Sequence, residues 1–122
     1  MAYLRMPGGS DNLVTSKINL ENIKKGLNER GLKYVDWNVS AGDAESHGVS
    51  ADKIRQNIMI QCKDKSIAVI LMHDTYYNGF TVEALPDIIK YLKKEGFIFR
   101  TFDGLTPNEE HRMVNSRVIN RL

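Results

Sequence analysis

The chain has 122 residues, enough for one domain, and its 42% hydrophobic and 26% charged residues are ordinary for a globular protein. A formal net charge of +2 is too small to indicate a nucleic acid or an anionic membrane as partner. The lone cysteine excludes an intramolecular disulfide, and no apolar stretch approaches the roughly 20 residues of a membrane span.

The first half of the chain alternates apolar runs with amphipathic stretches. Residues 2–6 and 32–39 are predicted to form β-strands. A helix is expected over about residues 20–30, with Asn19 as its cap and Gly31 closing its end. Ser50 is expected to cap a second helix, in which apolar residues recur every fourth position as Ile54, Ile58 and Cys62.

The same alternation continues in the second half. Residues 67–72 are continuously apolar and β-branched, which predicts a strand buried on both faces. The next helix begins near Thr81, and its expected apolar residues are Leu85, Ile88, Ile89 and Leu92. A fourth strand is predicted at residues 97–102. A capping box at 106–109, with Pro at the first helical position, then starts a last helix that carries Met113, Val114, Val118 and Ile119.

Four β-α units in succession indicate an α/β fold with a parallel sheet and helical crossovers. Four such units fit a small open sheet. They fit equally well half of an eight-unit barrel, or half of a related distorted and incomplete (β/α) barrel.

Ligands of parallel α/β folds bind at the C-terminal ends of the strands. The residues that follow the predicted strands are Arg5, Pro7, Trp37, Asn38, Ser40, Asp43, His73, Asp74, Asp103 and Gly104. His73 follows six apolar residues directly, so it is a candidate for proton transfer, or equally a histidine that only hydrogen-bonds a neighbouring loop. Trp37 fits core packing better than a sugar-stacking wall.

A metal site is not predicted from this chain alone. Its three histidines are His47, His73 and His111, and no two are spaced to share a helix face or loop. His-x-x-x-His, His-Glu-x-x-His and cysteine-pair motifs are absent from the sequence. His47 and His111 are expected to be ordinary surface residues.

Five segments occur in an order and spacing that resemble the second half of the polysaccharide deacetylases, the NodB-homology domain of carbohydrate esterase family four. They are Arg5–Ser10, Val35–Asp43, Ile70–Asp74, Thr81–Ile89 and Gly96–Phe99. The resemblance implies that residues 1–122 form the C-terminal half of such a domain, which folds as a distorted, incomplete β/α barrel. The implied reaction is metal-dependent hydrolysis of N-acetyl groups from N-acetylglucosamine polymers of the peptidoglycan or chitin type. The metal of full-length relatives is a divalent ion, usually zinc.

The resemblance also assigns expected roles to individual residues. His73 corresponds to the catalytic acid, and Asp43 to the aspartate that holds and tunes it. Arg5 corresponds to the arginine that orients the catalytic base, with Pro7 beside it on the groove wall. Two further substrate contacts are expected, with Leu71 lining the pocket for the acetyl methyl group and Trp37 in the segment just before Asp43.

The departures from the family pattern concern the base and the metal. The opening Thr-Phe-Asp-Asp-Gly type motif is absent, because residues 101–104 look similar but fall at the wrong end of the domain. The His-Ser/Thr-x-x-His motif that supplies two metal ligands is also absent, and Ala44 stands where many members have a groove tryptophan. The resemblance therefore implies a truncated deacetylase that is inactive alone.

Three expectations about partners follow. The exposed sheet edge of a half-barrel favours a homodimer or larger assembly, or a missing N-terminal half. A non-catalytic carbohydrate-binding or interaction module and one half of a split deacetylase are the alternatives. Residues 1–5 show no export signal, whereas full-length relatives act mostly at the cell envelope, so the location of this chain stays open.

Overall fold

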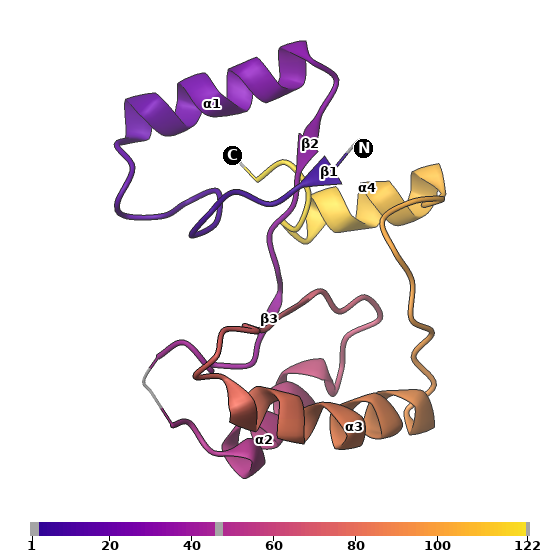
Figure 1. Ribbon diagram of the computed structural model, residues 1–122. Helices are drawn as coiled ribbons and strands as arrows, with labels where there is room; N and C mark the ends of the chain where they lie inside the picture. The colour runs from indigo at the N-terminus through magenta and orange to yellow at the C-terminus, as the bar shows by residue number, and fades with distance from the viewer. Residues whose placement is uncertain (1–2, 46–47, 122) are drawn as a thin grey trace. The chain divides into compact units, whose positions relative to one another are not determined.

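A computed structural model describes residues 3–45 and 48–121, which form an α/β fold with short parallel strands and four helices (Figure 1). Two compact units make up the chain, one from residues 1–36 and 101–122 and the other from residues 37–100. No helix in the described ranges is long and apolar enough to cross a membrane.

The first unit contains strands β1 (Tyr3–Leu4) and β2 (Lys33–Tyr34) and helices α1 (Lys17–Glu29) and α4 (Pro107–Asn115). β1 and β2 pair in parallel. The core of this unit consists of the buried residues Met6, Leu20 and Tyr34, with Leu4 and Leu27 packed against them. α1 contributes Leu20 and Leu27 to this core, two residues that lie on the same face of the helix.

The second unit contains strands β3 (Val39–Ser40) and β4 (Ile70–Leu71) and helices α2 (Ala51–Cys62) and α3 (Gly79–Lys94). β3 and β4 pair in parallel, with Val39 opposite Ile70 and Ser40 opposite Leu71. The two helices lie side by side (Figure 1). Their shared core is formed by Ile54, Ile58 and Cys62 of α2 and by Ala84, Ile88 and Leu92 of α3.

The helix starts follow local sequence signals. The expected caps at Ser50 and Thr106 are confirmed, and the Thr106–Glu109 capping box forms both of its hydrogen bonds. The expected cap at Asn19 is wrong, because Ser16 lies one turn earlier and its hydroxyl accepts the Asn19 amide at 3.2 Å. In α3, the expected core position Leu85 is 37% exposed, and the neighbouring Ala84 is buried instead.

Three further expectations were wrong. Residues 32–39 do not form one strand, because β2 and β3 belong to different sheets. Residues 67–72 are only half-buried, since one face, formed by Ala68, Ile70 and Met72, packs against the α2–α3 core. The last helix ends at Asn115, and Arg117 then takes a φ of 63°, so Val118 and Ile119 are buried beyond the helix.

The fourth predicted strand is absent from the described part of the chain. Residues 97–102 are assigned to no sheet. Phe97 packs against the α2–α3 core, whereas Ile98 is 83% exposed and Phe99 is 52% exposed. A β-strand exists only where a neighbouring strand pairs with its backbone, and apolar composition cannot supply that partner.

The packing between α2 and α3 predicts how the second unit responds to a cavity. Ile58 is fully buried, so Ile58→Ala should lower the free energy of unfolding by about 2–5 kcal/mol. Ile60→Ala on the same helix is the matched control, because Ile60 is 73% exposed and its truncation should change stability by less than about 0.5 kcal/mol. Urea denaturation followed by fluorescence of the single tryptophan, Trp37, measures both. Equal effects of the two substitutions would contradict this packing.

Candidate functional site

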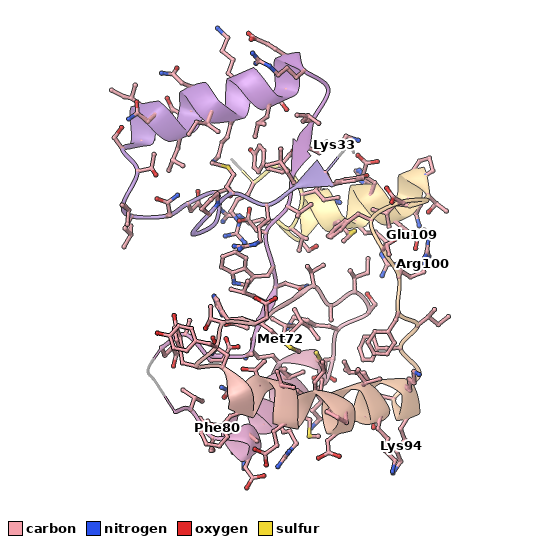
Figure 2. All side chains as sticks on the ribbon, viewed as in Figure 1. Lys33, Met72, Phe80, Lys94, Arg100 and Glu109 are labelled. Atoms are coloured by element: carbon pink, nitrogen blue, oxygen red, sulfur yellow. The ribbon has the colours of Figure 1, made fainter. Side chains whose placement is uncertain are left out.

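The parallel pairing of β3 and β4 brings two titratable residues together. Asp43 follows β3 by three residues, and His73 follows β4 by two. Because Ser40 lies opposite Leu71 in a parallel register, the chain leaves both strands at the same edge of the sheet. Met72, which precedes His73, packs against the α2–α3 core (Figure 2) and so anchors the end of β4.

His73 binds Asp43 through two of its nitrogens. The Nδ1 atom of the imidazole lies 2.8 Å from Asp43 Oδ1, and the backbone N–H of His73 donates to Asp43 Oδ2 at 2.8 Å. The side chain of Asp43 is 2% exposed, whereas that of His73 is 35% exposed. The carboxylate is therefore buried behind an imidazole ring that reaches solvent.

The surroundings of Asp43 favour its ionised form. Burial raises the pKa of this carboxyl group, but hydrogen bonds from the His73 side chain, the His73 amide and the Thr81 hydroxyl outweigh burial and lower the pKa below its usual value. Since an ionised carboxylate only accepts hydrogen bonds, the proton between the two side chains is assigned to Nδ1. The Nε2 atom of His73 then remains available for proton transfer.

Two residues that were not among the expected site residues support Asp43. Thr81 donates its hydroxyl to Asp43 Oδ2 at 2.8 Å, and Asn78 donates from Nδ2 to the Asp43 carbonyl at 3.2 Å. Asn78 is the N-cap residue of α3, yet its side chain makes no capping hydrogen bond. The sequence alone could not predict this role, because an asparagine at the start of a helix usually caps it, whereas Asn78 binds a neighbouring loop instead.

Helix α2 holds the segment before Asp43 with two amides. Gln61 exchanges a pair of hydrogen bonds with Ser40, donating to its carbonyl at 2.8 Å and accepting its amide at 2.9 Å. Asn57 donates to the carbonyl of Ala41 at 2.9 Å. Gly42 has a φ of 72°, and a Cβ there would lie 2.8 Å from the Asn57 amide nitrogen. The positive φ therefore favours glycine at position 42, and a Cβ there would also displace the Asn57 amide that binds the Ala41 carbonyl.

The other expected site residues lie in both units. Leu71 is half-buried in β4, and Trp37 is half-buried just before β3, outside the group of residues packed on the α2–α3 core. Arg5 and Pro7 belong to the first unit, and both are exposed. Of the expected site residues, His73 and Asp43 are the two for which the structure describes a direct contact.

A second buried carboxylate fixes the turn that follows Arg5 and Pro7. Asp36 is 2% exposed and accepts the backbone N–H of Ser10 at 2.9 Å and the Ser10 hydroxyl at 2.5 Å. Asp36 was not among the expected site residues. It lies inside residues 32–39, which were predicted to form one strand, and there a single aspartate gave no sign of its role.

The described residues do not fit the metal that the family resemblance implies. Within 3–45 and 48–121, no group of three or more His, Cys, Asp or Glu side chains is arranged to hold a metal ion. His111 is exposed on α4 with Asn115 beside it, and His47 lies outside the described residues. Asp74, Asp103 and Gly104 are exposed.

Comparisons with known proteins identify relatives of one kind. No protein-family model matches the chain. The chain is 33% identical over 90 residues to a bifunctional xylanase/deacetylase of Pseudobutyrivibrio xylanivorans, a match that covers 69% of this chain and 13% of that protein. It is 31% identical over 106 residues to the peptidoglycan-N-acetylglucosamine deacetylase of Bacillus cereus, covering 84% of this chain and 36% of that protein.

Solved structures agree with the sequence matches. The catalytic domain of a peptidoglycan N-acetylglucosamine deacetylase from Eubacterium rectale superposes with a TM-score of 0.77 at 31% identity, over 87% of this chain and 49% of that chain. A CE4 esterase of Streptococcus mutans gives a TM-score of 0.66 at 31% identity, over 80% and 42%. The chain spans less than half the length of each of these proteins. It is therefore a distant homologue of the CE4 polysaccharide and peptidoglycan deacetylases, covering part of their catalytic domain.

Proposed function

We propose that this chain carries the proton-donating part of a polysaccharide deacetylase site, with His73 as the general acid and Asp43 as the residue that holds it. The observation that carries the proposal is the hydrogen bond of 2.8 Å between His73 Nδ1 and Asp43 Oδ1. Its proposed substrate class is a polymer of N-acetylglucosamine, which is supported by the two relatives that are peptidoglycan N-acetylglucosamine deacetylases.

The geometry of His73 suits protonation of a leaving amine. Hydrolysis of an N-acetyl group breaks a C–N bond, and the amine departs readily only when its nitrogen receives a proton. With Nδ1 committed to Asp43, the protonated imidazole delivers its other proton from Nε2. The negative charge of Asp43 stabilises the imidazolium, and its buried position keeps water from replacing the bond.

The remaining site residues take supporting roles in this proposal. Leu71 offers apolar contact to the acetyl methyl group, and the half-buried Trp37 offers a ring face to a sugar. Arg5 is exposed, so its guanidinium is free to orient a carboxylate base, with Pro7 beside it. These contacts would bind and orient the substrate.

The chain alone is proposed to be inactive, because it supplies neither a metal site within its described residues nor the motif that carries the base. The relatives extend beyond the matched region, which supports a role for residues outside this chain. Residues 1–122 would then form the C-terminal half of a deacetylase domain of incomplete-barrel type. Another polypeptide would supply the missing base and metal site. The outer edges of the two-stranded sheet of β3 and β4 favour association with that polypeptide or with a second copy of this chain.

The pKa of Asp43 gives the proposal a test in acid. A carboxyl group with a lowered pKa in the folded protein adds stability above its unfolded pKa of about 3.9 and loses it as the pH falls through the folded value. The stability advantage of the wild type over Asp43→Asn should therefore be about 1.5–3 kcal/mol at pH 5 and should shrink as the pH falls below about 3.9. Asp74→Asn is the matched control because Asp74 is exposed. Urea denaturation at each pH measures the difference, and a constant advantage would mean that Asp43 is not held as a charged group.

Acetate release tests the activity directly. The purified chain should release no acetate from N-acetylglucosamine oligomers with zinc or cobalt added, and chelator should change nothing. Mixing with the part of the Bacillus cereus relative that precedes its matched region should restore release. In that mixture His73→Ala should lower the rate by about 10²–10⁴-fold, and His111→Ala, on the exposed face of α4, should leave it unchanged.

Two outcomes would contradict the proposal. Metal-dependent release by the chain alone would mean that it builds a complete site. Restored release that survives His73→Ala would remove this residue from proton transfer. Binding of the oligomer without restored release would favour the alternative of a non-catalytic carbohydrate-binding module.

A further inference from the structure

We infer that Thr81 is a positioning residue, which with Asn78 sets the orientation of the Asp43–His73 pair from the first turn of α3. The inference rests on the proposed function of His73 as the acid. It concerns a residue that contacts the carboxylate and not the imidazole.

The hydroxyl of Thr81 restricts how the Asp43 carboxylate can rotate. Asp43 Oδ2 accepts two hydrogen bonds at 2.8 Å, one from Thr81 Oγ1 and one from the backbone N–H of His73. These donors belong to different segments, the start of α3 and the end of β4. With Oδ2 held from both, Oδ1 is directed at Nδ1 of the ring.

Thr81 occupies a position where the helix pattern calls for an apolar side chain. It is 5% exposed and continues the buried row of α3 that contains Ala84, Ile88 and Leu92. These residues pack against α2, so the location of Thr81 is fixed by the helix contact. A buried hydroxyl in such a row requires a partner, and Asp43 provides it.

Asn78 ties the backbone of Asp43 to the same helix end. Its Nδ2 donates to the Asp43 carbonyl at 3.2 Å, and its Oδ1 accepts from the Thr75 hydroxyl. Asn78 is 6% exposed, so its hydrogen bond to the Asp43 carbonyl is shielded from water. The side chain and the backbone of Asp43 are thus both attached to the start of α3, so the position of α3 determines the orientation of the His73 ring.

The test follows the His73 Nδ1–H proton by NMR at low temperature. In the wild type this proton should give a downfield resonance, protected from exchange by the buried acceptor. Thr81→Val keeps the shape and removes the hydroxyl, so the resonance should shift and its exchange with water should accelerate several-fold. Thr81→Ser keeps the hydroxyl and should restore the wild-type signal. Thr101→Val, at an exposed threonine, should change nothing.

The outcomes separate this inference from the proposed function. An unchanged resonance in Thr81→Val overturns the positioning role while leaving the His73–Asp43 pair in place. A resonance that persists in Asp43→Ala removes the pair itself and with it the proposed function. If Thr81→Val does not fold by circular dichroism, Thr81→Ala replaces it. In the wild type, the Thr81 hydroxyl proton should also show a nuclear Overhauser effect to the His73 amide proton, and its absence would equally overturn the inference.

Discussion

Residues 37–100 are organised around the burial of one negative charge. An ionised carboxylate removed from water costs several kcal/mol unless donors replace the lost hydration. Asp43 is 2% exposed, and its donors are the amide and ring of His73 and the hydroxyl of Thr81. The ends of β3 and β4 and the start of α3 must therefore meet at hydrogen-bonding distance. The bonds that satisfy the charge also fix the imidazole, so forming the fold and forming the site are one event.

The helix α2 serves this arrangement with two rows of side chains. Its apolar row packs against α3 and so locates Thr81. The side-chain amides of Asn57 and Gln61 bind the backbone of residues 40–41, which lie just before Asp43. A change in the contact between α2 and α3 would therefore move the donor and the acceptor of the Thr81–Asp43 bond relative to each other.

Local patterns predicted the parts of the fold that depend on neighbours in sequence. The caps at Ser50 and Thr106 rest on hydrogen bonds within one helix, and the apolar row of Ile54, Ile58 and Cys62 follows the helical period, so the sequence predicted both. Residues 97–102 have the composition of a strand, but pairing depends on a distant segment. His73 was a candidate from its place after an apolar run, and Asp43 was a candidate from the family resemblance; the structure adds the contact between them. Thr81 could not be found, because a threonine near a helix start looks like an ordinary polar residue.

Each of the two units contains a buried aspartate that makes the same kind of paired contact. In each, a buried aspartate accepts the backbone N–H and a side-chain donor of a single residue, Ser10 for Asp36 and His73 for Asp43. Such a paired contact fixes both the backbone and the side chain of that residue, which one bond could not do. For Ser10 the result is a held turn, whereas for His73 it is an oriented, titratable ring. Among the described residues, the side-chain hydrogen bonds to Asp43 come from His73 and Thr81 of the same unit, so the orientation of the His73 ring is set within residues 37–100. On the proposed function, the polypeptide that supplies the base must also supply the metal site and bring a water molecule and the substrate to Nε2 of His73.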